Sequence, residues 1–115
     1  MEMLYHITSA AEARIAEAQG WYEPATFAQE GFIHCAFVQQ ILGVSSRYYA
    51  GQQGLVLLTI EPTAVGCEIR VENLMAGAEL FPHVYGRLPW AAVPQIYDFP
   101  CDATGVFTLP ERLVG

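Results

Sequence analysis

The sequence predicts a single α+β domain over residues 1–115, in which two N-terminal helices pack on a bent, mostly antiparallel sheet. Its 115 residues are enough for one hydrophobic core and too few for two. Hydrophobic residues make up 53% of the chain and charged residues 15%, a balance that excludes disorder. Helical periodicity is confined to the first half, whereas strand-like apolar runs continue towards the end.

The first strand is expected over residues 4–7 and leads directly into a helix. Ser9 and Glu12 have the S-x-x-E spacing of a capping box, which satisfies free backbone N–H groups at a helix start. Gly20 is well placed to end this helix. The i, i+4, i+7 spacing predicts a buried stripe made of Ala11, Ile15 and Ala18.

The stretch Glu-Gly-Phe-Ile-His-Cys-Ala-Phe, residues 30–37, places a histidine and a thiol in an apolar run. A strand over residues 32–35 puts His34 on the side of Phe32 and opposite Ile33 and Cys35. We therefore expect His34 to be buried. Burying an unpaired imidazole costs about 1–3 kcal/mol, so the ring needs a partner or a function.

The second helix is expected to end near Gly51. Its apolar positions at helical spacing are Phe37, Ile41, Val44 and Tyr48. Residues 55–60 form a nearly continuous aliphatic run, which is typical of a central strand, and residues 67–72 alternate as in a half-exposed strand. Later expectations are a shaped loop over 80–86, an edge strand within 91–99 and a short edge strand over 106–109.

The charge excludes several function classes. A formal net charge of −7 and a pI near 4.7 argue against a nucleic-acid partner and favour a small-molecule ligand. Lysine is absent, which excludes a Schiff-base lysine and a P-loop.

No apolar run is long enough to cross a membrane, and the N-terminal residues do not resemble a signal peptide, so we expect a cytoplasmic protein. The three cysteines are widely spaced and are interpreted as free, buried thiols.

The candidate catalytic residues are the three histidines, His6, His34 and His83, because each lies among apolar or aromatic neighbours. One alternative is that they are core histidines bonded to backbone carbonyls. A metal site formed by all three is another, although no two of them have the short spacing that would anchor such a site. Cys35 cannot pair with His34, since adjacent strand residues point to opposite faces. We predict no metal site.

Four further residues are candidates for substrate binding: Tyr49, Glu72, Tyr85 and Arg87. Tyr48 continues the apolar stripe of the second helix, which leaves Tyr49 as the freer hydroxyl. Glu72 is the acid most readily placed near a site, although a solvated strand end is an alternative. Glu30 is interpreted either as a site residue or as an exposed turn residue.

The motifs Gly-Phe-Ile-His-Cys-Ala and Phe-Pro-His-Val-Tyr-Gly, separated by Leu-Val-Leu-Leu-Thr-Ile-Glu, resemble the bacterial domain-of-unknown-function family 952. The resemblance extends from Tyr5 to about Val93. The chain departs from the family at Ala36, where serine is usual, and at Arg87, where proline is usual. A hydroxyl at position 36 is therefore dispensable or lost.

The order of the elements is also distantly similar to the start of the ADP-ribosyltransferase superfamily. That resemblance implies an ADP-ribosyltransferase-like fold in which His6 binds the ribose of NAD and His34 helps to hold the nicotinamide side. The third role falls to Glu72 or His83, and the resemblance leaves both open.

Two functions follow as hypotheses. The first is a small-ligand-binding protein, acting as an NAD- or ADP-ribose-handling enzyme with a three-histidine pocket, for which NAD is a substrate and no cofactor is required. The second is a non-catalytic ligand-binding or interaction module whose histidines are structural. The sequence leaves the oligomeric state open.

Overall fold

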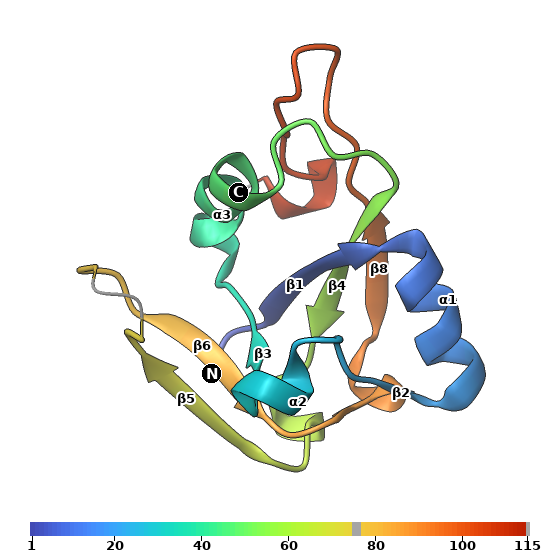
Figure 1. Ribbon diagram of the computed structural model, residues 1–115, viewed down its shortest axis with the longest axis vertical. Helices are drawn as coiled ribbons and strands as arrows, with labels where there is room; N and C mark the ends of the chain where they lie inside the picture. The colour runs from blue at the N-terminus through green and yellow to red at the C-terminus, as the bar shows by residue number, and fades with distance from the viewer. Residues whose placement is uncertain (75–76, 115) are drawn as a thin grey trace.

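The computed structural model describes residues 1–74 and 77–114 and confirms the α+β class, with three small antiparallel sheets where the sequence predicted one bent sheet (Figure 1). In the central sheet, β4 (Leu55–Ile60) lies between β1 (Leu4–Ser9) and β8 (Gln95–Asp98). In the second sheet, β6 (Phe81–Tyr85) lies between β3 (Ile33–His34) and β5 (Glu68–Glu72). The third sheet pairs β2 (Trp21–Tyr22) with β7 (Leu88–Pro89).

Three α-helices accompany the sheets in the described residues, one more than the sequence predicted: α1 (Ala10–Gln19), α2 (Phe27–Glu30) and α3 (Ile41–Tyr48). Short 3₁₀ turns cover Val38–Gln40, Pro62–Ala64, Trp90–Ala92 and Glu111–Leu113. The additional helix, α2, is a single turn. A segment this short carries no readable periodicity, which is why the sequence did not reveal it.

The ends of α1 are as predicted, but its buried face is not. The Glu12 N–H donates to the Ser9 hydroxyl at 3.0 Å, and Gly20 closes the helix in the left-handed region at φ 93°. The predicted stripe of Ala11, Ile15 and Ala18 is wrong. Ala13 and Ala16 are buried instead, and Ile15 is 54% exposed. A face of two small alanines allows the helix axis to lie close to the sheet, whereas Ile15 would hold it away.

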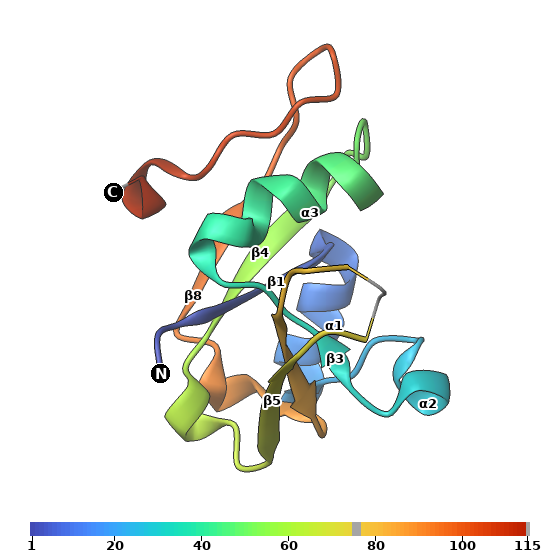
Figure 2. The same cartoon turned by 90° about the vertical axis from the view of Figure 1, so that its left-hand side faces the viewer.

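The central strand β4 is buried throughout and divides the core into two halves, as the aliphatic run predicted. Val56, Leu58 and Ile60 point to the side covered by α1. Leu55 and Leu57 point to the opposite side and pack in the cluster that contains Ile41 of α3. The alternation follows from the two-residue repeat of a strand. Figures 1 and 2 show α1 and α3 on opposite sides of this sheet.

The second predicted helix is shorter than expected and its face is rotated. It ends at Tyr48 rather than near Gly51, and residues 38–40 before it form a 3₁₀ turn. Its buried face is centred on Ile41 and Ser45. Tyr48, predicted to be core, is 52% exposed, whereas Tyr49 is half-buried. A 3₁₀ turn has 3.0 residues rather than 3.6, so counting from Phe37 gives the wrong phase for the helix that follows.

Three later expectations are corrected. The segment predicted as a loop over 80–86 is largely strand β6. Its proline lies where β3 has ended at His34, and the Pro82 carbonyl still accepts from the Cys35 N–H. The predicted strand within 91–99 is reduced to β8, which lies at the sheet edge just after Pro94. Residues 106–109 form no strand: Phe107 makes one isolated bridge to Cys101.

The thiol prediction holds in part. The three cysteines are free, but only Cys35 is fully buried, while Cys67 and Cys101 are partly exposed.

The two-sided core gives a first prediction. Leu58 is 0% exposed, so Leu58→Ala should lower the free energy of unfolding by about 2–5 kcal/mol, through lost burial and the cavity that remains. The matched control is Leu42→Ala on the solvent side of α3, where Leu42 is 39% exposed and the change should be within about 0.5 kcal/mol. Urea denaturation measures both, and equal midpoints for the two variants would contradict the assigned core.

Candidate functional site

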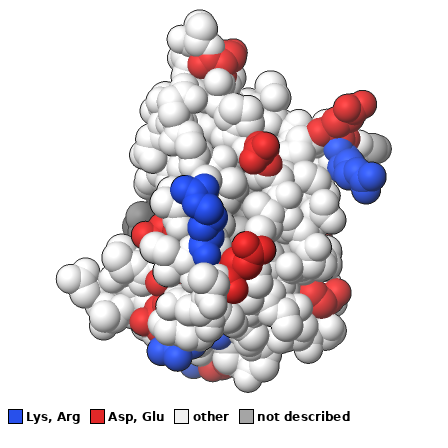
Figure 3. Space-filling view, turned by 90° about the vertical axis from the view of Figure 1, so that its right-hand side faces the viewer, with Lys and Arg blue, Asp and Glu red and all other residues white. Residues whose placement is uncertain are grey.

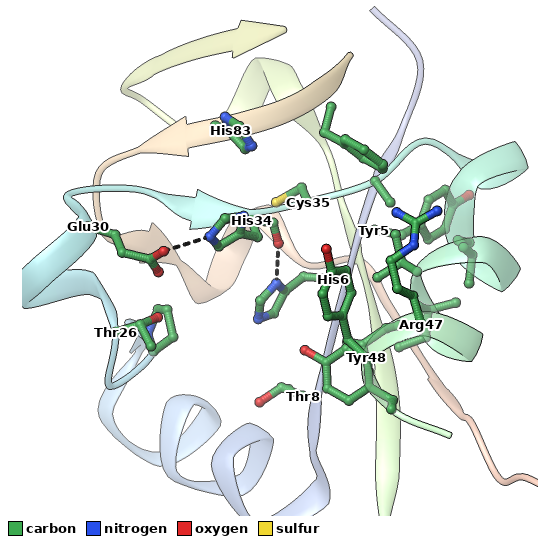
Figure 4. Close-up of a pocket in the computed structure, with 18 of the residues that line it drawn as sticks. Tyr5, His6, Thr8, Thr26, Glu30, His34, Cys35, Arg47, Tyr48 and His83 are labelled. Atoms are coloured by element: carbon green, nitrogen blue, oxygen red, sulfur yellow. Dashed lines mark hydrogen bonds and ion pairs between the residues drawn. The ribbon is translucent and has the colours of Figure 1, made fainter. Parts of the chain in front are cut away.

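A pocket of about 1010 Å³ lies beyond the edge of β1, between α3, β3, α2 and the connection from β5 to β6 (Figure 4). All three histidines line it, together with Glu30, Tyr49 and Glu72. The residues that the sequence proposed as catalytic are therefore gathered at one place, although they come from three segments far apart in the chain.

The pocket exists because β1 and β3 separate after a single bridge. Tyr5 and Ala36 exchange two backbone hydrogen bonds of 2.8 Å each. In a regular antiparallel ladder the next such pair would be Ile7 and His34. Instead, the His34 carbonyl accepts from Nδ1 of His6 at 2.6 Å. The edge of β1 from Ile7 to Ser9 is left to line the pocket.

His6 is held neutral at the base of the pocket. It is 8% exposed, and burial lowers the pKa of its imidazole to about 4. Since a carbonyl can only accept, Nδ1 carries the proton and Nε2 is an acceptor. The Tyr22 hydroxyl lies 2.8 Å from Nε2 and 3.2 Å from Thr8 Oγ1. Tyr22 therefore donates to His6, which leaves the Thr8 hydroxyl to donate to Tyr22. Burial also raises the pKa of Tyr22 to about 12.

His34 differs from its prediction, because its side chain is 48% exposed rather than buried. Its partner is Glu30, the last residue of α2, with 3.0 Å between Nε2 and Oε2. That hydrogen bond lowers the pKa of the Glu30 carboxyl. The predicted side is right, since the rings of Phe32 and His34 are 4.7 Å apart. Cys35 points into the core, as expected, where burial raises the pKa of its thiol.

His83 forms a second imidazole–carboxylate pair. Its side chain is 4% exposed, and Nδ1 lies 2.9 Å from Oε2 of Glu72. The Tyr85 hydroxyl donates to the same oxygen, and the bonds from Tyr85 and His83 lower the pKa of Glu72. The rings of His34 and His83 meet edge to face with centroids 5.3 Å apart. Glu72 and His83, which the sequence left as competitors for one role, are thus hydrogen-bonded to each other.

Two of the predicted binding residues do not line the pocket. Tyr85 reaches it only through Glu72. Arg87 stacks on the ring of Trp21 at 3.7 Å and pairs with Glu23 at 3.4 Å. The family usually has proline at position 87. The arginine found here therefore changes a surface contact with Trp21 and Glu23 that is separate from the pocket.

Sequence reasoning missed Arg47, Tyr22 and Thr8. Arg47 is in the last turn of α3 and lies with Tyr48 on the wall opposite His34 and Glu30 (Figure 4). In the sequence, Arg47 has the pattern of a solvated helix end and gives no signal of its own. Thr8 did carry a signal, since it is two residues from His6 on the same strand face.

Other classes of site receive no positive indication. Among residues 1–74 and 77–114, no group of three or more His, Cys, Asp or Glu side chains is arranged to hold a metal ion. Within the same residues, no helix has both the length and the hydropathy of a membrane span. On the face shown in Figure 3, arginines lie singly among acidic side chains rather than in a basic patch.

Comparison with solved structures gives a protein from Caulobacter crescentus that is similar over almost the whole chain. The crystal structure of protein CC0527 from Caulobacter crescentus matches with a TM-score of 0.86 and 33% sequence identity, covering 99% of this chain and 100% of that chain. The solution NMR structure of CC0527 matches with a TM-score of 0.84 and 36% identity, covering 99% and 98%. No functionally curated protein matches. The family described as "Protein of unknown function (DUF952)" matches residues 7–96, and the chain belongs to this family.

Proposed function

We propose that the pocket binds a small ligand and that the protein is a cytoplasmic nucleotide-handling enzyme of the ADP-ribosyltransferase type, with NAD or ADP-ribose as its ligand and no required cofactor. The observation that carries the proposal is that His6, His34 and His83 line one pocket of about 1010 Å³. That volume is at the upper end of the range for small-molecule sites, as a dinucleotide requires.

The walls of the pocket offer contacts suited to the parts of such a ligand. The backbone groups of Ile7 point away from β4 on the free edge of β1, where a planar amide such as the carboxamide of nicotinamide can pair with them. Arg47, on the opposite wall, supplies a guanidinium for phosphate oxygens. Arg87, a binding candidate from the sequence, does not line the pocket, so we assign the phosphate contact to Arg47.

The proposed chemistry breaks the bond between the ribose C1′ and the pyridinium nitrogen. The bonding electron pair leaves with nicotinamide, which becomes neutral, and the ribose becomes oxocarbenium-like until an acceptor oxygen or water attacks it and loses a proton. Glu72 and Glu30 would favour the positive charge on the ribose electrostatically. The proposed roles of His34 and His83 are to hydrogen-bond the ribose hydroxyls and to receive the acceptor's proton.

A second candidate is a non-catalytic binding module whose histidines are structural. One observation favours it: both ring nitrogens of His6 are used within the protein, by the His34 carbonyl and the Tyr22 hydroxyl. His34 and His83 differ, because each uses one ring nitrogen for a carboxylate, and no described residue bonds the other.

Ligand binding tests the first proposal. Calorimetric titration with NAD and with ADP-ribose should show saturable binding, and His34→Ala or His83→Ala should raise the Kd about tenfold, the cost of one lost hydrogen bond to a charged or polar ligand group. Gln95→Ala, exposed on β8, is the control and should leave the Kd unchanged. If neither nucleotide binds, the nucleotide proposal is wrong.

Arg47 gives a separate prediction. Arg47→Gln should raise the Kd for ADP-ribose by about tenfold to a hundredfold, because a charge-assisted bond to phosphate is lost, and should leave nicotinamide binding nearly unchanged. Arg112→Gln, which removes an equal charge from an exposed 3₁₀ turn, is the matched control. An equal loss in both variants would show a general charge effect rather than a phosphate contact.

The role of His6 in stability is tested by pH. Its pKa is lowered in the folded state from 6.5 to about 4, so its contribution is complete above pH 6.5 and is lost as the pH falls towards 4. The loss over this window should be on the order of 3 kcal/mol. His6→Asn keeps an N–H near the position of Nδ1 but does not titrate, so its stability should vary less between pH 6.5 and 4.5. Urea midpoints measure both proteins, and parallel pH profiles would refute the assignment.

A further inference from the structure

Most of the charged side chains that line the pocket are acidic. Four carboxylates line it: Glu12, Glu30, Glu72 and Glu79. Arg47 is the one lysine or arginine among the described lining residues. Within residues 1–74 and 77–114, none of the four carboxylates forms an ion pair with an arginine. Their other described contacts are hydrogen-bond donors, such as the Gln40 amide on Glu79 and the Tyr85 hydroxyl on Glu72. No described arginine therefore pairs with these carboxylates, and the imidazoles beside Glu30 and Glu72 offset their charge only when they are protonated.

Aromatic rings share the same walls. The rings that line the pocket are those of Tyr5, Tyr22, Tyr48, Tyr49 and Phe81. The face of an aromatic ring attracts a cation, and the attraction grows when the cation is removed from water. Carboxylates and aromatic rings that line one pocket favour a cation that also carries apolar surface. A bare metal ion is not favoured, because the described acids and histidines offer no group of three ligands.

The Nε2 atom of His83 is a polar atom of a buried side chain that lines the same pocket. The His83 side chain is 4% exposed and lines the pocket, with Nδ1 committed to Glu72. No described residue bonds its Nε2, and this atom is not among the fully enclosed atoms that lack a partner. Nε2 therefore keeps some exposure in a side chain that lines the pocket, and the centroids of the His83 and His34 rings are 5.3 Å apart. The site has a position for a ligand polar group beside its carboxylates.

We propose that the histidine end of the pocket selects an organic cation, such as a pyridinium or an alkylated ammonium group, over a neutral molecule of the same shape. The selection comes from Glu30 and Glu72 beside His34 and His83, with the aromatic walls covering the apolar part of the ligand. The inference rests on the proposal that the pocket binds a small ligand, and it does not require that ligand to be a nucleotide. An anionic group of the same ligand would lie at the Arg47 wall.

The test uses pairs of probes that differ mainly in charge. 1-Methylnicotinamide is compared with nicotinamide, and choline with 3,3-dimethylbutan-1-ol, by calorimetry and by ligand-observed NMR. The cation of each pair should bind about tenfold more tightly than its neutral counterpart. The preference should decrease as salt is raised, since exposed carboxylates contribute to it.

Two variants locate the selection. Glu72→Gln and Glu30→Gln each remove one charge with little change of shape, and each should reduce the preference for the cation about threefold or more. Glu68→Gln is the matched control, because it removes the same charge from the same strand as Glu72 but lies outside the pocket. Glu30 is on a surface helix, so Glu30→Gln remains informative if Glu72→Gln disturbs the fold.

The outcomes separate this inference from the proposed function. It is overturned if the neutral probes bind as tightly as the cations, if no cation binds, or if neither variant reduces the preference. If 1-methylnicotinamide binds with the expected preference while NAD and ADP-ribose do not bind, the cation site stands and the nucleotide proposal fails. If ADP-ribose binds as tightly as NAD, the nucleotide proposal stands and the cation site fails.

Discussion

The backbone bridge between Tyr5 and Ala36 is the interaction on which the pocket depends. Its two hydrogen bonds join the edge of the central sheet to the segment that follows β3. A longer ladder would close the space between the two sheets, which also pack together where Ile33 and Val84 enter the core beside Leu58. The His6 imidazole ends the ladder by bonding the His34 carbonyl, which satisfies a buried acceptor that the next backbone pair would otherwise serve. A polar side chain in the core is thus what keeps the strand edge open.

The three histidines differ in burial and in hydrogen-bond partners, although all three have apolar or aromatic neighbours in the sequence. His6 is buried with both nitrogens bonded, and its surroundings keep it neutral. His34 and His83 each have a carboxylate behind one nitrogen, which orients the ring and strengthens the other nitrogen as an acceptor. One site thus contains a histidine with both ring nitrogens bonded and two histidines with one ring nitrogen bonded to a carboxylate, an arrangement with which both functional hypotheses are compatible.

Much of the framework was predictable, because local signals and their structural causes coincide. The Ser9 cap of α1, the aliphatic central strand and the opposed directions of His34 and Cys35 depend on neighbouring residues and were predicted correctly. Of the two bonds of the predicted capping box, the one from the Glu12 N–H to the Ser9 hydroxyl is present. The errors arise where the path of the chain in space, rather than the local sequence pattern, determines which side chains meet or are exposed. Gly31, in the left-handed region at φ 78°, turns the chain so that Glu30 meets His34 four residues later. The exposure of His34 follows from its place at the rim of a pocket, and no periodicity in a two-residue strand reports that.

The acidity of the pocket follows from how its base and rim are built. His6 contacts a carbonyl and a hydroxyl, so a proton on its ring would gain no carboxylate partner and would lose hydration. Burial therefore outweighs the single hydrogen bond that favours the charged form, and the base of the pocket stays neutral. The carboxylates lie at the more exposed rim, where water reduces the cost of keeping them ionised. The base of the pocket is thus neutral and its rim acidic, and Arg47, on one wall, is the one lysine or arginine among the described lining residues. A ligand with unlike charges at its two ends would consequently enter this pocket in one preferred orientation.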